Sequence, residues 1–252
     1  MFLSLKKQIL RIYFLKKIVL SLKLLINKNS DSFYLSIGDQ RMIERNYKEA
    51  ILCYSRSIKL NSKNLISFYK RGEAYISIGN YYSAISDFTN VIDFNKQIWY
   101  VYLQRGIAKE LNGDYKGASD DYLKNLEINK KCPLTFKLIA LSKEKLGDTK
   151  GAIEACTKSI NLCRKYYGVY RERGRMKMDL GLYEEAIEDF DNEIINDPKD
   201  YEALILRGKC YEKVSNFKKA YFDMKYANQL QNKKESNNAF LKDNIKLYIQ
   251  ET

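Results

Sequence analysis

The sequence contains no histidine and only two prolines, Pro133 and Pro198, in 252 residues. Without histidine, the chain lacks the side chain that most often serves as a general base near neutral pH. An interior proline costs a helix about 3 kcal/mol or more, so the scarcity of proline suits a chain that is mostly helical. The composition therefore favours an all-helical protein and argues against histidine-dependent catalysis.

Cysteine is sparse, and no two cysteines have the CxxC spacing of a zinc or redox motif. The five are Cys53, Cys132, Cys156, Cys163 and Cys210. Scattered cysteines of this kind are typical of small core residues in a reducing compartment. No glycine-rich phosphate loop is present, and acidic pairs such as Glu184 and Glu185 lie where a helix is expected to start, which favours the helix dipole. We therefore expect no catalytic, cofactor or metal site, and a cytoplasmic location.

The positive charge is concentrated at the beginning of the sequence. The formal net charge is +13, and residues 1–30 hold seven basic residues and no acidic one. The other 222 residues carry 37 basic and 31 acidic residues, without a long basic run. Nucleic-acid binding requires a clustered basic surface, so the body of the chain is not expected to bind nucleic acid.

A period of 34 residues organises the sequence from residue 31 onward. Small residues recur on this grid at Gly38, Gly72, Gly106, Ala140, Gly174 and Gly208. Twelve residues after each of them stands an alanine, at Ala50, Ala84, Ala118, Ala152, Ala186 and Ala220. Four residues beyond the alanine is a large or soft apolar side chain, namely Tyr54, Phe88, Tyr122, Cys156, Phe190 or Met224.

Each 34-residue unit predicts two helices joined by a tight turn. The second unit shows the amphipathic stripe of its second helix, in Ala84, Ile85, Phe88, Val91 and Ile92. Glycines suited to left-handed backbone follow four of the first helices, at Gly79, Gly113, Gly147 and Gly181. Three of these glycines precede residues that cap the next helix, Asn80, Asp114 and Asp148. Asparagines end three of the second helices, where we expect left-handed backbone at Asn61, Asn95 and Asn129.

This pattern resembles the tetratricopeptide repeat (TPR) family, whose unit is a 34-residue helix–turn–helix. The resemblance covers six repeats, over residues 31–64, 65–98, 99–132, 133–166, 167–200 and 201–234. It implies an all-α fold, a right-handed α-solenoid of helix–turn–helix repeats known as the TPR superhelix. Residues 235–252 are expected to add one more helix that caps the stack, since an open stack requires a polar outer face.

The resemblance also implies a binding groove lined by the first helix of each repeat. Carried onto this sequence, it offers an apolar set in repeats two to four: Ile66, Tyr69, Tyr100, Leu103, Ile107, Leu134, Leu138 and Leu141. Repeats five and six offer a charged set: Arg171, Glu172, Arg175, Glu202, Lys209 and Glu212. The alternative for several of the leucines is that they complete the packing between helices.

One activity of the family is argued against. Members that bind chaperone C-terminal tails use lysine, asparagine and arginine at fixed positions on three consecutive first helices. The central asparagine position is occupied here by Lys70, Gln104, Leu138 or Glu172. A chaperone tail is therefore not the expected partner.

Arginine and aspartate vary together across the six repeats. Four repeats carry both, sixteen residues apart: Arg71 and Asp87, Arg105 and Asp121, Arg173 and Asp189, Arg207 and Asp223. The other two repeats carry neither, and have Ile37 with Cys53 and Ile139 with Ala155. This joint change predicts structural ion pairs within a repeat, although shared ancestry of duplicated repeats would also produce the pattern.

Residues 1–30 are apolar and basic together, and three interpretations remain open. Lysines interrupt the apolar stretches, so no run of about 18 uncharged residues exists for a spanning helix. The segment is a degenerate capping helix, a membrane-surface anchor or an organelle-targeting leader. The leading hypothesis for the whole chain is a non-catalytic scaffold that binds a peptide or helix of another protein in its groove. The alternatives are a membrane-tethered adaptor attached through residues 1–30, and an accessory subunit of an enzyme complex.

Overall fold

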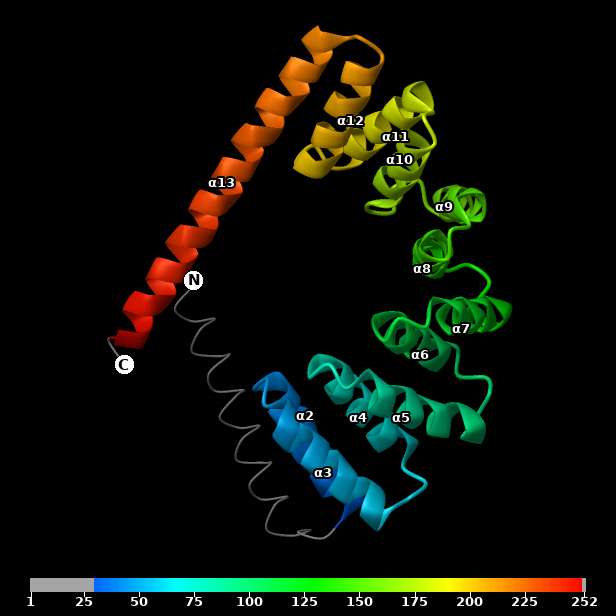
Figure 1. Ribbon diagram of the computed structural model, residues 1–252. Coiled ribbons are helices and arrows are strands. Elements are labelled where there is room, and N and C mark those ends of the chain that lie inside the picture. Colours follow the sequence, from blue (N-terminus) through cyan, green and yellow to red (C-terminus); the bar gives the residue numbers. More distant parts are fainter. Residues whose placement is uncertain (1–29, 251–252) are drawn as a thin grey trace, which may run out of the picture. The chain divides into compact units, whose positions relative to one another are not determined.

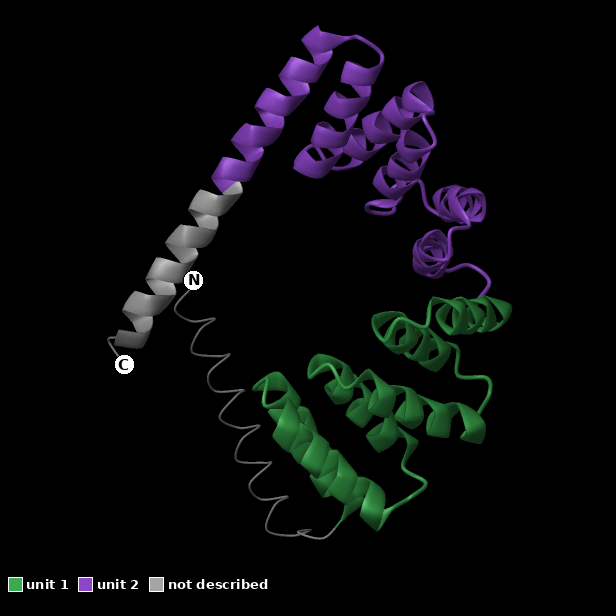
Figure 2. Ribbon diagram, in the orientation of Figure 1, with its two compact units in different colours: residues 1–128 green, residues 129–252 purple. Residues whose placement is uncertain are grey.

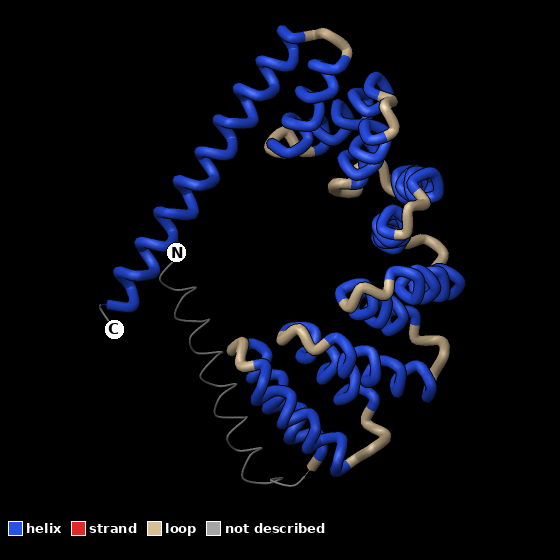
Figure 3. The backbone as a smooth tube through the Cα atoms, in the orientation of Figure 1, coloured by secondary structure: helices blue, strands red, loops and turns tan. Residues whose placement is uncertain are grey.

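The computed structural model describes the backbone of residues 30–250 and the side chains of residues 30–233. The described backbone forms twelve α-helices and no strand (Figure 3). The chain divides into two compact units, unit 1 over residues 1–128 and unit 2 over residues 129–252 (Figure 2). The division falls near the end of the third repeat, residues 99–132. The basic segment over residues 1–30 lies outside the described residues, except for Ser30.

The helices come in pairs, two for each repeat (Figure 1). In unit 1 they are α2 (Asp31–Ile43), α3 (Tyr47–Leu60), α4 (Leu65–Ser77), α5 (Tyr81–Phe94), α6 (Trp99–Leu111) and α7 (Tyr115–Ile128). In unit 2 they are α8 (Pro133–Lys145), α9 (Thr149–Leu162), α10 (Val169–Asp179), α11 (Tyr183–Asn196), α12 (Tyr201–Lys213) and α13 (Phe217–Gln250). Within each unit, every helix packs against the next one along the chain. The fold is an all-α helical repeat solenoid.

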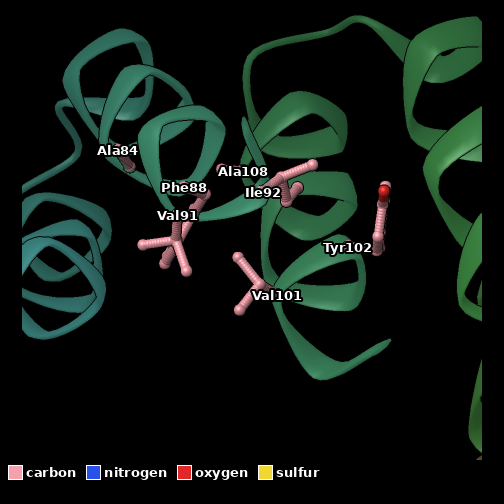
Figure 4. Packing of buried hydrophobic residues seen from close by; sticks show 7 residues of the cluster. All are labelled: Ala84, Phe88, Val91, Ile92, Val101, Tyr102 and Ala108. Atoms are coloured by element: carbon pink, nitrogen blue, oxygen red, sulfur yellow. The ribbon is translucent and has the colours of Figure 1, made fainter. Parts of the chain in front are cut away.

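The core of unit 1 shows why the repeat needs its small residues. Phe88 of α5 is fully buried and lies in one cluster with Val101 and Ala108 of α6 (Figure 4). A Cβ atom on Gly72 would come within 2.7 Å of the Phe88 ring, closer than two carbon atoms can pack. Glycine at this position therefore lets the first helix of the repeat lie directly on the aromatic ring of the second.

The turns within the repeats follow the predicted chemistry. Gly79 and Gly113 have left-handed backbone, with φ of +77° and +84°. The Asn80 side chain then accepts a hydrogen bond from the Ser83 N–H at the start of α5. In the first and last repeats, Arg45 and Ser215 stand in place of the glycine and also have positive φ.

The junctions between repeats differ from the prediction. Asn61 and Asn95 have extended backbone, with φ of −143° and −146°, so the expected left-handed conformation is wrong. The side chain of each asparagine instead accepts a hydrogen bond from the backbone N–H two residues later, at Lys63 and Gln97. Asparagine is useful here because its side chain closes a turn onto its own backbone, and not because it tolerates positive φ.

The last helix of the described chain is continuous. The second helix of repeat six and the extra helix expected over residues 235–252 form one element, α13, which runs without interruption to Gln250. Among the described residues, no helix combines the length and the apolar character that crossing a membrane would require.

Candidate functional site

The predicted groove residues of unit 1 lie on α4 and α6. Ile66 is 60% exposed and Tyr100 is 43% exposed, whereas Tyr69 and Ile107 are half-buried. Leu103 is only 8% exposed, so it packs between helices instead of lining an open surface. We call the remaining four, Ile66, Tyr69, Tyr100 and Ile107, the unit 1 face.

Aromatic contacts fix the centre of the unit 1 face. The Tyr69 ring lies 5.7 Å from the buried Phe88 ring and 5.4 Å from the Tyr100 ring, which it meets edge to face at 82°. Such edge-to-face pairs are favourable beyond the area they bury. Burial raises the pKa of Tyr69, and the neighbouring Glu73 carboxylate raises it further. The Tyr69 hydroxyl therefore remains a hydrogen-bond donor at neutral pH, on a ring that the core holds in place.

Carboxylates lie on the same first helices. The buried Tyr54 hydroxyl donates a hydrogen bond to Asp39 of α2, and the buried Tyr122 hydroxyl donates one to Glu110 of α6, both at 2.8 Å. Glu73 of α4 has a side chain that is 31% exposed. One cation, Lys70, lies 3.8 Å from Asp39. The other cations of these helices, Arg41, Arg71, Arg105 and Lys109, are paired with carboxylates on the second helices. The first helices of unit 1 therefore present aromatic side chains together with the carboxylates of Asp39, Glu73 and Glu110.

In unit 2, the three predicted leucines, Leu134, Leu138 and Leu141, are half-buried on α8. The two predicted arginines form ion pairs with carboxylates of unit 2. Arg171 lies 2.6 Å from Asp200. Arg175 forms a two-pronged ion pair with Glu144, at 2.6 and 2.7 Å. A peptide would therefore meet both arginines already paired with carboxylates.

The four predicted arginine–aspartate pairs are each formed within a repeat. Arg71 donates two hydrogen bonds to Asp87, at 2.8 and 2.7 Å. The arginine of each of the other three pairs lies 2.6 to 2.7 Å from its aspartate, in Arg105 with Asp121, Arg173 with Asp189, and Arg207 with Asp223. The aspartates are nearly buried, so these residues are structural and are not candidates for catalysis or ligand binding.

The same arginines make a second contact that the sequence reasoning missed. The Nη1 atom of Arg71 donates to the Ser55 hydroxyl on α3, at 2.9 Å. The equivalent acceptors in the other repeats are Thr89, Thr157 and Asp191. Each arginine thus joins three helices, and two of them belong to its own repeat. The available signal was a hydroxyl or carboxylate sixteen residues before each arginine.

Buried Glu193 is another polar residue that the sequence did not reveal. Its carboxylate on α11 accepts hydrogen bonds from the backbone N–H groups of Gly168 and Arg171, at 2.9 and 3.2 Å. These groups begin α10, whose N-cap residue supplies no side-chain bond. Glu193 therefore caps α10 from a neighbouring helix. Among the described side chains, no group of three histidine, cysteine, aspartate or glutamate residues is placed to hold a metal ion.

The comparisons with known proteins agree with this architecture. Residues 66–98 match the family model of the tetratricopeptide repeat. No curated protein matches the sequence. The fold is similar to the crystal structure of MamA protein, with 22% identity, 69% of this chain and 96% of that chain covered, and a TM-score of 0.63.

Two further solved structures are similar at lower identity. YrrB, described as a TPR protein with an unusual peptide-binding site, is 19% identical, with 71% of this chain and 92% of that chain covered and a TM-score of 0.58. The pilF protein of Pseudomonas aeruginosa is 14% identical, with 77% and 88% covered and a TM-score of 0.64. At these identities, the similarity concerns the fold alone.

Proposed function

This chain is a tetratricopeptide repeat protein, and we propose that it is a non-catalytic scaffold that binds a segment of another protein on the unit 1 face. Its fold neighbours support a protein partner in general, and YrrB is described as having a peptide-binding site. The observation that carries the proposal is the Tyr69–Tyr100 pair, in which half-buried Tyr69 and exposed Tyr100 lie 5.4 Å apart beside the buried Phe88 ring.

The physics of protein interfaces favours this surface. Binding energy concentrates in a few aromatic or arginine side chains that are well packed and lose water on binding. Tyr69 is fixed by Phe88 and loses little side-chain entropy when a partner arrives. Ile66 and Tyr100 are large apolar side chains with much of their surface in water. A partner that covers these side chains removes their apolar surface from water, and this burial stabilises the complex.

The charged side chains on the same helices indicate which kind of segment the unit 1 face attracts. Four cations of these helices, Arg41, Arg71, Arg105 and Lys109, are paired with carboxylates on the second helices. Beside these pairs, Asp39, Glu73 and Glu110 outnumber Lys70, so a basic segment is attracted and an acidic one is repelled. The proposed ligand is a stretch of chain that combines apolar or aromatic residues with lysine or arginine. The proposed place of action is the cytoplasm, where the free cysteines would remain reduced.

A comparison of three versions of the full chain tests the proposal. We expect the wild-type chain to capture a partner from a cell extract, and Tyr69→Ala with Tyr100→Ala to weaken its binding by about 2 kcal/mol or more, as hot spots do. Tyr82→Ala is the matched control, because Tyr82 is 80% exposed on α5, away from the unit 1 face. The measurement is the dissociation constant of each version for the partner identified by mass spectrometry.

The result that would refute the assignment is equal affinity of the three versions, with circular dichroism showing the same helix content. If only the Tyr82→Ala control binds the partner more weakly, the binding surface lies on the second helices instead. Loss of binding in a high-salt buffer would support the role of the carboxylates, since exposed charges are screened by salt.

A further inference from the structure

Four aromatic side chains lie exposed on α13, the last helix of unit 2. They are Phe217, Tyr221, Phe222 and Tyr226, and their exposed fractions run from 45% for Tyr226 to 67% for Phe217. The Tyr221 and Phe222 rings meet edge to face, with centroids 5.9 Å apart. Exposed aromatic clusters of this kind mark interaction surfaces, because protein interfaces are enriched in tyrosine and phenylalanine.

The position of α13 at the end of the stack does not explain two of these aromatics. Phe222 and Tyr226 stand at repeat positions that repeats two to five leave exposed and fill with polar residues. The pairs at these positions are Ser86 with Asn90, Asp120 with Lys124, Glu154 with Lys158, and Glu188 with Asn192. A further helix stacked on α13, as α6 is stacked on α5, would therefore leave both aromatics exposed. Their apolar surface is available for a contact outside the stack.

The exposed charge around these aromatics is positive. Over residues 217–233, α13 exposes four lysines, Lys218, Lys219, Lys225 and Lys233. The single carboxylate of this stretch, Asp223, is nearly buried and lies 2.6 Å from Arg207. Two copies of this surface therefore repel each other, whereas a surface that carries carboxylates attracts it. We call the four aromatics and the four lysines together the α13 surface.

The unit 1 face has the complementary chemistry. It is apolar and aromatic at its centre, where Tyr69 and Tyr100 meet. The carboxylates of Asp39, Glu73 and Glu110 lie on the same set of first helices. Such a face favours a segment that combines aromatic residues with lysine, and the α13 surface has this composition on one helix. A second copy of the chain therefore carries a ligand of the kind that the unit 1 face favours.

We propose that the α13 surface of one copy docks on the unit 1 face of a second copy, with Phe222 and Tyr226 against Tyr69 and Tyr100. This inference rests on the proposed function of the unit 1 face and adds a competitor for it, because a partner protein must displace the second copy. The two copies contribute different surfaces, so the contact is heterologous. Association therefore continues beyond the dimer, into head-to-tail chains or a closed ring.

Analytical ultracentrifugation of the full chain over a range of concentrations tests the proposal. We expect the average mass of the wild type to rise above that of the monomer as the concentration increases. The mass should fall toward that of the monomer in a high-salt buffer, because salt screens exposed charges.

Two double variants each remove one side of the contact. Phe222→Ser with Tyr226→Asn gives α13 the polar pair that repeat two has at these exposed positions, and should weaken self-association about tenfold or more. Tyr69→Ala with Tyr100→Ala should weaken it by a similar factor. Tyr82→Ala removes an exposed aromatic of α5 and is the control that keeps the wild-type behaviour. Circular dichroism checks that each variant retains its helix content.

A mixture of the two double variants identifies the contact. The Phe222→Ser with Tyr226→Asn variant keeps its unit 1 face, and the Tyr69→Ala with Tyr100→Ala variant keeps its α13 surface. Where each alone is monomeric, their mixture should form a one-to-one dimer and nothing larger, because one working pair of surfaces remains. A Tyr69→Ala with Tyr100→Ala variant that associates like the wild type would instead indicate contact between two α13 surfaces, and would overturn the proposal.

Failure of this inference and failure of the proposed function give different results. A wild type that stays monomeric at every concentration in low salt overturns the second copy as the occupant. The unit 1 face then remains a binding surface if Tyr69→Ala with Tyr100→Ala still weakens binding of a protein captured from an extract, and the proposed function also fails if it does not. A monomeric wild type whose binding to vesicles of anionic lipid is lost in Phe222→Ser with Tyr226→Asn would assign the α13 surface to a lipid surface, which also overturns the inference.

Discussion

At the scale of single residues, the close approach of two helices depends on what stands opposite the small residue. Gly72 faces the rigid Phe88 ring, and an added Cβ would lie 2.7 Å from it. Gly208 occupies the same repeat position but faces the flexible Met224 side chain, and its added Cβ would lie 3.3 Å away. The two glycines thus form a natural comparison of steric and conformational effects.

The first prediction concerns these two glycines. Gly72→Ala should destabilise the chain by about 1–3 kcal/mol, because the ring cannot move without disturbing the core. Gly208→Ala should be neutral or stabilising by up to about 1 kcal/mol, since alanine has the higher helix propensity and methionine can shift. Urea unfolding measures both changes, and equal effects of the two substitutions would contradict the steric explanation.

Glu193 gives a prediction about pH. Burial raises the pKa of this carboxyl above its ordinary value of 4.5, although the two N–H groups that it accepts from oppose the shift. The folded chain therefore holds the proton more tightly than the unfolded chain. The Glu193 contribution to the free energy of unfolding is consequently greatest at low pH, and it falls as pH rises through the interval above 4.5.

Glu193→Gln removes this titration and keeps a side-chain oxygen for one of the N–H groups. The free energy of unfolding of the wild type, minus that of the variant, should increase as pH is lowered from neutral toward 4.5. Urea titrations at a series of pH values measure this difference. Glu188→Gln, at an exposed position of the same helix, is the control. A difference that is constant or that shrinks on acidification would count against the buried cap.

At the scale of helices, the arginine–aspartate pair is the main polar contact between the elements of a repeat. The Arg71 and Asp87 side chains are 18% and 4% exposed. Arg71 is the only cation within ion-pair distance of Asp87 among the described residues, whereas Asp121 also has Lys109 at 2.9 Å. Removal of Arg71 therefore leaves a nearly buried carboxylate without a counter-ion.

We expect Arg71→Ile to cost about 3–5 kcal/mol in unfolding free energy, as for other broken buried pairs. The double substitution Arg71→Ile with Asp87→Ala should recover most of that loss, because it leaves no buried charge. It also reproduces the residues that repeat four has at these positions, Ile139 and Ala155, which are 4% and 5% exposed. A double variant no more stable than the single one would refute this view of the pair.

Some polar contacts between helices can be predicted from the sequence, and others cannot. The pairing of arginine with aspartate is visible because both positions change together among the repeats. The bond from Arg71 to Ser55 is less visible, because the acceptors sixteen residues before the arginines are serine, threonine or aspartate and share only an oxygen that can accept. The ion pair between Arg175 and Glu144 joins residues 31 positions apart that occur in one repeat pair only, so no repetition indicates it.

At the scale of the whole molecule, the 34-residue period was enough to predict an all-α solenoid, because helices, turns and small residues recur in one register. The continuity of α13 could also have been anticipated, since no glycine or proline follows Gly208. The candidate face was less predictable. Family positions indicate which side chains lie on the first helices, but the burial of Leu103 and the pairing of Arg171 depend on the three-dimensional neighbours.

The central claim is that a partner lies against Tyr69 and Tyr100. The most direct measurement replaces Tyr100 with a photo-crosslinking phenylalanine derivative in the full chain, and makes the same replacement at Tyr82 as the control. Irradiation in a cell extract should produce a discrete crosslinked protein from position 100 and not from position 82. Crosslinks of the same protein from both positions, or from position 82 alone, would contradict the account.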